Sequence, residues 1–191
     1  MDFFKWAAPF YDLAMKVVGH GGSLKQLMER IEPAAGDKLL DLGGGTGQLL
    51  DYLPENVKVT LVDSSEEMLV RAKRKERKQK VKYINARGDN LPLPDDTFDY
   101  IVVADALHHF TKVDETIREL KRVLKPGGKL YIMEFDPETL LTRFISGAES
   151  LAGEPANFYS PEELSKLVTE IGLNPEIDGI SKSLYILQGS K

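Results

Sequence analysis

The sequence predicts a doubly wound α/β fold, with a mostly parallel seven-stranded sheet and helices on both of its faces. Apolar runs alternate with amphipathic stretches at regular spacing, which is the pattern of a parallel sheet covered by helices. Two short extended segments close the chain, around Pro175–Ile180 and Ser183–Gln188, and the turn between them is too short for a crossover helix. We therefore expect them to pair antiparallel. The five strands expected before them are Lys38–Leu42, Lys58–Val62, Val81–Asn85, Tyr100–Ala104 and Lys129–Phe135.

Three helices are marked by start or stop signals. Ser64, followed three residues later by Glu67, fits a capping box at the start of the helix after the second strand. A second helix is expected over Asp114–Leu124, and it stops where proline and two glycines follow. Ser160 is the expected cap of the last helix, with proline in its first turn and Glu163 at the third position.

The length and composition of the chain are those expected of a single domain. The chain has 191 residues, of which 42% are hydrophobic, and no apolar run approaches the length that spans a bilayer. The N-terminus lacks the basic start and the long apolar stretch of a signal peptide, so a cytoplasmic location is expected. Cysteine is absent, which excludes disulfides, thiolate metal ligands and cysteine nucleophiles.

The charge pattern argues against nucleic acid as a partner. The formal net charge is -5, although basic residues crowd together between Arg71 and Lys82. The favoured interpretation of that stretch is the solvated face and frayed end of a helix, because no aromatic residue interleaves with the charges before Tyr83. A patch that contacts RNA is the alternative.

The most informative segment is Leu39–Gly47, a buried strand that breaks into a glycine turn. Glycine adopts backbone angles closed to other residues, and it lets a ligand approach the main chain closely. Sixteen residues past Gly47, the second strand ends at Asp63. A carboxylate at that strand tip is placed to accept hydrogen bonds from ribose hydroxyls, so the segment predicts a nucleoside site.

The spacing of the glycines separates two classes of ligand. They run Gly43-x-Gly45-x-Gly47, whereas the dinucleotide fingerprint has a longer last gap. Asp41 lies two residues ahead of the first glycine, where an anion would disfavour a diphosphate. A ligand with an ammonium and a sulfonium group tolerates that carboxylate. The pattern therefore favours S-adenosylmethionine over a nicotinamide dinucleotide.

Two further blocks, Leu91–Asp99 and Leu124–Gly128, complete a recognisable set with the glycine turn and Asp63. With them the chain resembles the class I S-adenosylmethionine-dependent methyltransferases, and most closely the branch of the ubiquinone/menaquinone-biosynthesis C-methyltransferases. The likeness runs from about Lys38 to Phe135, with a Tyr11-Asp12 pair near the start. It implies a Rossmann-like fold and S-adenosylmethionine as cofactor, and it is nearly silent about the acceptor.

The resemblance also implies roles for individual residues. Asp41 would reach the amino group of the cofactor, Asp63 its ribose hydroxyls, and Met68 its adenine. Ala104 would give a main-chain contact to the methionine part. The full set of expected cofactor-binding residues is Tyr11, Asp41, Gly43, Gly45, Thr46, Gly47, Asp63, Ser64, Met68, Gly88, Asp89, Asn90 and Ala104.

The chain departs from the family at the adenine end. The family usually has an acidic residue and alanine at the place held here by Arg87-Gly88. Either Gly88 supplies only a backbone contact, or Asp89 provides the carboxylate, which we favour. Asp89 and Asn90 as plain turn residues stay open. Asp63 as a plain helix cap is the less favoured alternative to ribose binding.

The candidate bases lie just beyond the fourth strand: Asp105, His108 and His109. An imidazole has a suitable pKa for a phenol or an activated carbon acid, and His108 is the candidate catalytic residue. A structural role competes strongly, because the surrounding segment resembles one found in relatives with varied substrates. No metal site is expected, since adjacent histidines rarely point at one ion and no clear third ligand is nearby.

The expected organisation is a single domain. Residues 1–35 form an N-terminal helical cap, 36–135 the cofactor-binding core, 136–160 an acceptor-side flap, and 161–191 the last helix and hairpin. Aromatic residues on the cap and the flap would clamp a flat acceptor such as a quinol ring. The predicted function is methyl transfer to a small-molecule acceptor by in-line displacement. The alternatives are a non-catalytic S-adenosylmethionine-binding protein and an RNA-modifying methyltransferase; the sequence does not indicate an oligomeric state.

Overall fold

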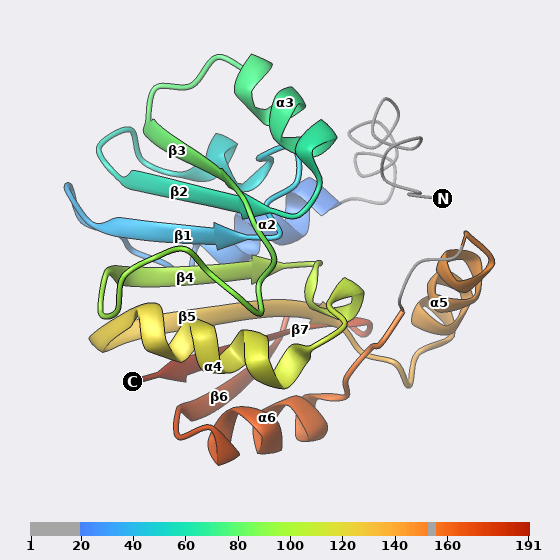
Figure 1. The fold of residues 1–191 in the computed structure, drawn as a ribbon. Coiled ribbons are helices and arrows are strands. Elements are labelled where there is room, and N and C mark those ends of the chain that lie inside the picture. The colour runs from blue at the N-terminus through green and yellow to red at the C-terminus, as the bar shows by residue number, and fades with distance from the viewer. Residues whose placement is uncertain (1–19, 153–155) are drawn as a thin grey trace.

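The seven strands form one sheet in the order β3-β2-β1-β4-β5-β7-β6 (Figure 1). The structure is a computed structural model, and it describes residues 20–152 and 156–191. Strands β1 to β5 run parallel, and β7 runs antiparallel to both of its neighbours. The strands are β1 Lys38–Leu42, β2 Lys58–Asp63, β3 Lys80–Asn85, β4 Phe98–Ala104, β5 Leu124–Phe135, β6 Asn174–Gly179 and β7 Leu184–Ser190. The predicted fold class is confirmed.

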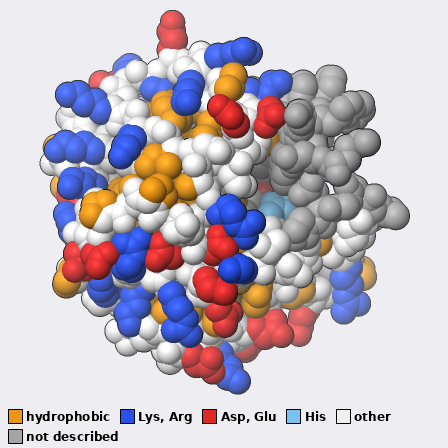
Figure 2. Space-filling model, viewed as in Figure 1, with side chains coloured by type: hydrophobic (Ala, Val, Ile, Leu, Met, Phe, Trp, Pro, Cys, Tyr) orange, Lys and Arg blue, Asp and Glu red, His pale blue; other side chains and the backbone are white. Residues whose placement is uncertain are grey.

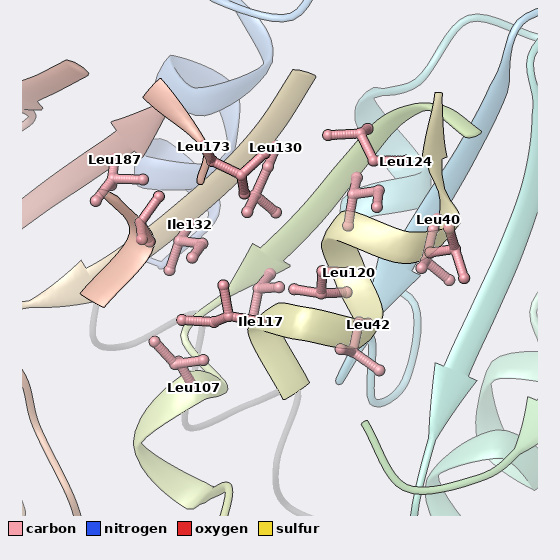
Figure 3. Packing of buried hydrophobic residues seen from close by; sticks show 14 of the residues in the cluster. Leu40, Leu42, Leu107, Ile117, Leu120, Leu124, Leu130, Ile132, Leu173 and Leu187 are labelled. Carbon is pink, nitrogen blue, oxygen red and sulfur yellow. The ribbon is translucent and has the colours of Figure 1, made fainter. Parts of the chain in front are cut away.

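Helices cover both faces of the sheet because its central strands are apolar on both sides. They are α2 His20–Met28, α3 Glu66–Arg74, α4 Val113–Val123, α5 Leu140–Ala152 and α6 Pro161–Glu170, with short 3₁₀ turns η1 Leu49–Tyr52 and η2 Leu107–His109. Leu40 joins one core with Ile117 and Leu120 of α4, as Figure 3 shows. Its neighbour Leu39 points the other way, into a second core with Leu69 of α3. This alternation is the two-residue period of a strand.

The order of strands reverses between β1 and β4, which places a topological switch point there. β1 pairs with β2 on one side and with β4 on the other. In open α/β sheets, ligands bind outside the carboxyl ends of the strands at such a point. In Figure 1 the arrowheads of these strands point towards the side on which α5 lies. None of the helices within 20–152 and 156–191 has the length and apolar character to cross a bilayer.

One helix start is corrected by the structure. The cap of α3 is Ser65 and not Ser64, since the Ser65 hydroxyl accepts the Met68 N–H at 3.4 Å. Asp63 accepts the backbone N–H of Ser65 at 2.8 Å, so the chain enters the helix one residue later than predicted. The capping box at Ser160 is confirmed, with both reciprocal bonds to Glu163 present.

β5 begins at Leu124, five residues before the predicted start. Leu124 already pairs with Phe98, and a register shift separates that pair from the regular ladder that begins at Lys129. The segment expected to be an acceptor-side flap contains α5. Most of the expected N-terminal cap, including Tyr11, lies outside the described residues.

Candidate functional site

A pocket opens at the carboxyl ends of β1, β2 and β4, at the switch point of the sheet. Of the residues expected from the sequence to bind the cofactor, several line it. They are Gly43, Gly45, Asp63, Ser64, Met68, Gly88 and Asp89. The rest of the lining comes from residues 105–106 and 109–112, which follow β4, and from Leu42, Ser65, Ala86, Arg87 and Thr116. Among the described residues of the expected set, Asp41, Thr46, Gly47, Asn90 and Ala104 are not part of the lining.

The glycine turn has the backbone geometry that its sequence predicts. Gly43, Gly45 and Gly47 have φ values of 72°, 53° and 74°, which lie in the left-handed region that favours glycine. The N–H of Gly43 donates to the carbonyl oxygen of Val62 at 2.8 Å, which ties the turn to β2. A Cβ added at Gly43 would lie 2.6 Å from Cβ of Ala106, so only glycine allows this approach.

Asp63 joins the glycine turn to the start of α3. One carboxylate oxygen accepts the N–H of Gly45 at 2.8 Å, and the other accepts the N–H of Ser65 at 2.8 Å. Burial raises the pKa of Asp63, and the two N–H donors oppose that rise. Each carboxylate oxygen has a second lone pair, so Asp63 retains acceptor capacity towards the pocket. It is not the helix cap, since Ser65 fills that position.

Asp41 lies beneath the glycine turn and is 2% exposed. A Cβ added at Gly44 would lie 2.5 Å from Oδ2 of Asp41, so the turn rests directly on this carboxyl group. Among the described residues, that oxygen has no hydrogen-bond partner. Burial and the charge of Asp63, opposed by Arg77, together raise the pKa of Asp41 to about 7, and burial is the largest cause. The site therefore holds a buried acid that is half ionised near neutral pH.

Arg87, at the position where the sequence departs from the family pattern, forms an ion pair with Asp89. Arg87 donates to both carboxylate oxygens of Asp89, at 2.9 and 3.1 Å, and to the Thr111 hydroxyl at 2.9 Å. The Nζ atom of Lys112 is 3.6 Å from Asp89. The hydrogen bond from Arg87 is the main reason why the pKa of Asp89 is lowered, so Asp89 is ionised. Asn90 is a turn residue whose N–H donates to the Arg87 carbonyl oxygen.

The two adjacent histidines have different surroundings. His109 and Asp105 line the pocket, whereas His108 is not part of the lining and is 2% exposed. The Nδ1 atom of His108 lies 2.9 Å from both carboxylate oxygens of Glu134. Asp105 has a φ of 53°, an uncommon value for a residue other than glycine, and such values cluster at functional sites.

Glu134 is the residue that the sequence analysis missed. It stands in β5, within an otherwise apolar run, and its side chain is completely buried. A single acidic residue inside a buried strand is a signal that could have marked it, because buried carboxylates need specific partners.

Asp105, His108 and Glu134 bring possible metal-ligand atoms within 4.8 Å of one another. The sequence analysis saw no third ligand near the histidines, and Glu134 corrects that reasoning. The 2.9 Å separations between Nδ1 and the carboxylate oxygens are direct hydrogen-bond distances. They pair His108 directly with Glu134.

The basic stretch between Arg71 and Lys82 is partly used inside the domain. Arg77 donates to the Gly47 carbonyl oxygen at 2.6 Å and pairs with Asp51. Lys75 donates to the Thr46 hydroxyl at 3.1 Å. In Figure 2, Lys and Arg side chains predominate at the upper left, where Figure 1 places α3 and β3, whereas they are interspersed with Asp and Glu over the lower half. These contacts give part of the stretch a structural role.

The sequence is similar to those of known methyltransferases. Residues 40–132 match the family described as "Methyltransferase domain". The chain is 38% identical over 145 residues to the ubiquinone/menaquinone biosynthesis C-methyltransferase UbiE of Shewanella frigidimarina, covering 70% of this chain and 58% of that protein. The chain thus spans less than two thirds of the length of this curated relative.

Solved structures of low sequence identity share the fold. An S-adenosylmethionine-dependent methyltransferase of Thermotoga maritima superposes with a TM-score of 0.82 at 22% identity, over 99% of this chain and 98% of that one. The Haemonchus contortus phosphoethanolamine N-methyltransferase 2, solved in complex with S-adenosyl-L-methionine, gives 0.75 at 18% identity, over 89% of this chain and 52% of that one.

The sheet order and the pocket at its switch point define the Rossmann-like fold of the class I methyltransferases. The chain resembles the class I S-adenosylmethionine-dependent methyltransferases, including the branch of the ubiquinone/menaquinone-biosynthesis C-methyltransferases. S-adenosylmethionine is the cofactor of that class, as the glycine spacing predicted.

Proposed function

We propose that this chain transfers a methyl group from S-adenosylmethionine to a small-molecule acceptor by in-line displacement. The observation that carries the proposal is the hydrogen bond from the N–H of Gly45 to the carboxylate of Asp63. It fixes the carboxylate beside the glycine turn in the lining of the switch-point pocket. The bound cofactor supplies a sulfonium leaving group. The protein then has to hold the reacting atoms in line and exclude water.

The lining residues divide into a ribose end and an adenine end. Asp63 would accept hydrogen bonds from the two ribose hydroxyls, for which its oxygens retain lone pairs. Met68 would lie against the adenine ring, beside Gly88. A Cβ added at Gly88 would lie 2.9 Å from a side-chain carbon of Thr116. Asp89 is ionised and lines the same pocket, so it is the acceptor we assign to the adenine amino group.

Asp41 would act on the methionine part of the cofactor through its charge. It lies under the turn and outside the lining, so a water molecule or a through-space interaction would connect it to the ammonium group. A positive ligand above the turn would favour the ionised form of this buried acid.

For the acceptor we propose a hydroxylated aromatic ring of the quinol type. Support comes from the similarity to a C-methyltransferase of ubiquinone and menaquinone biosynthesis. A phenol becomes a stronger carbon nucleophile as it loses its proton, and an imidazole titrates in the range that this needs. His109 lines the pocket and is the base we assign, with Asp105 beside it on the same wall.

A methyl-transfer assay tests the proposal directly. Deuterated S-adenosylmethionine would be incubated with short-tailed naphthoquinols and benzoquinols, and the products analysed by mass spectrometry. We expect the label on a ring carbon of the quinol and none on the matching quinone, which lacks the nucleophilic phenol. Replacing His109 by Gln should slow transfer by about 100-fold, the usual contribution of a general base.

The alternatives predict other results in the same assay. Label in an RNA fraction, lost on reversal of the exposed charges of Arg74, Lys80 and Lys82, would replace the small-molecule acceptor by RNA. Cofactor binding without transfer to any fraction of a cell extract would instead indicate a non-catalytic binding protein.

A further inference from the structure

Glu134, in β5, is a fully buried acid that has no role in the chemistry proposed above. One of its oxygens accepts the N–H of Phe135 at 2.9 Å, and the other accepts the backbone N–H of His108 at 3.2 Å. Both oxygens lie 2.9 Å from Nδ1 of His108. A fully buried carboxylate is stable only when such donors surround it, so Glu134 and His108 form a fixed unit.

His108 connects that unit to the segment that follows α5. Its carbonyl oxygen accepts the N–H of Asn157 at 3.0 Å. Its ring stacks on Phe158, with ring centres 4.3 Å apart and planes 16° apart. The centre of the His109 ring lies 4.0 Å from the centre of the His108 ring. His108 therefore contacts β5, the segment 156–159 and the histidine that lines the pocket.

We infer that His108 and Glu134 are positioning residues, which dock the segment 156–159 and orient His109 towards the acceptor. The inference rests on the proposed function and assigns to His109 the contact with the acceptor that the sequence analysis gave to His108. His108 donates from Nδ1 to a carboxylate, and a ring nitrogen bound in this way has its tautomer fixed. His108 also lies outside the pocket lining, whereas His109 is part of it.

The decisive variants change one part of this arrangement at a time. In His108→Asn, the side-chain amide can donate to Glu134 in place of Nδ1, whereas His108→Ala removes the donor. Glu134→Gln keeps the shape of the side chain but has a single acceptor oxygen for three N–H donors. Phe158→Leu removes the stack and leaves the carboxylate untouched. Glu176→Gln, at an exposed position of β6, is the matched control for the change of charge.

Three measurements separate the inference from the proposed function. Calorimetry with S-adenosylhomocysteine reports the cofactor site, the quinol assay reports transfer, and ¹⁵N NMR of the histidine rings reports the tautomer of His108. We expect all variants to keep the affinity for S-adenosylhomocysteine within about twofold, because none of these side chains lines the cofactor end. If the unmodified chain does not bind S-adenosylhomocysteine, the proposed function fails, and the NMR measurement still tests the pairing.

The expected pattern is specific. Glu134→Gln and His108→Ala should each slow transfer by about 100-fold, the loss that follows when reacting groups are misplaced by about 1 Å. His108→Asn should recover at least tenfold of the loss seen in His108→Ala, and Phe158→Leu should raise the KM of the acceptor more than it lowers kcat. The Nδ1 signal of His108 should be protonated across pH 6–8 and should move in Glu134→Gln only.

Two results would overturn the inference. One is a His108→Asn variant as inactive as His108→Ala while Glu134→Gln keeps full activity, which would make His108 the base. The other is broadening of the His108 ring signals by one equivalent of Mn²⁺, which would make Asp105, His108 and Glu134 a metal site.

Discussion

Replacing Asp41 by Asn should stabilise the free protein above neutral pH and weaken its binding of the cofactor. The carboxyl group is buried under the glycine turn, and burial is the main cause that raises its pKa to about 7 from an ordinary value of 3.8. A raised pKa means that the folded state binds more protons than the unfolded state between these two values. Stability is therefore lost as the pH rises from about 4 to 7, and the full cost is present above 7.

The size of the effect follows from the same two values. A difference of one unit between the folded and unfolded pKa corresponds to about 1.4 kcal/mol. The ionised Asp41 therefore lowers the free energy of unfolding at pH 8 by at most about 4 kcal/mol. An Asn side chain does not ionise and avoids that cost. We therefore expect Asp41→Asn to be more stable at pH 8, by up to about 4 kcal/mol, and no more stable at pH 4.

Urea unfolding at pH 4, 6 and 8 measures this difference, with Glu176→Gln as an exposed control that should show no such trend. In calorimetry, the affinity for S-adenosylmethionine should rise with pH through 7 in the unmodified chain and lose this dependence in Asp41→Asn. An Asp41→Asn protein that is less stable by the same amount at every pH would refute the reasoning. It would show that the carboxylate is satisfied in the fold.

Three further substitutions test other parts of the account. Asp63→Asn should weaken S-adenosylhomocysteine binding by about 1.5–3 kcal/mol in calorimetry, since it removes a charged acceptor. It keeps one acceptor oxygen for the N–H groups of Gly45 and Ser65 and should lower the melting temperature, and Asp63→Ala, which leaves both without an acceptor, should lower it more. Gly44→Ala should destabilise the fold by about 1–3 kcal/mol in thermal melts, because its Cβ would lie 2.5 Å from the buried carboxylate oxygen of Asp41. The control Gly22→Ala, which has open space around its Cβ, should not destabilise the fold. Arg122→Met should cost about 2 kcal/mol in urea unfolding and leave cofactor affinity unchanged, since its guanidinium donates to the carbonyl oxygens of residues 91 and 93, away from the pocket.

The elements of the fold were predictable because the patterns that mark them, apolar runs and helix start signals, are local in the sequence. β1 has the predicted bounds, and the helix starting after Ser160 has its complete capping box. Helix α3 shows the limit of that approach. The sequence predicted Ser64 as its cap, whereas in the folded chain the N–H of Ser65 donates to Asp63 and Ser65 is the cap.

The glycine turn, Asp63 and Met68 were predictable for the same reason, and all contribute to the pocket. The orientation of the two histidines was not, because it depends on how η2 packs on β5. Glu134 lies 26 residues from His108 in the chain, and no spacing within the sequence pairs them. Only the folded sheet shows which histidine reaches the pocket.

Calorimetric titration with S-adenosylhomocysteine and with NADH tests the central claim most directly, namely that the switch-point pocket is built for a sulfonium nucleoside and not for a dinucleotide. The account predicts one binding site for S-adenosylhomocysteine, weakened in Asp63→Asn, and no detectable heat from NADH. Saturable binding of NADH, or S-adenosylhomocysteine binding that Asp63→Asn leaves unchanged, would contradict it.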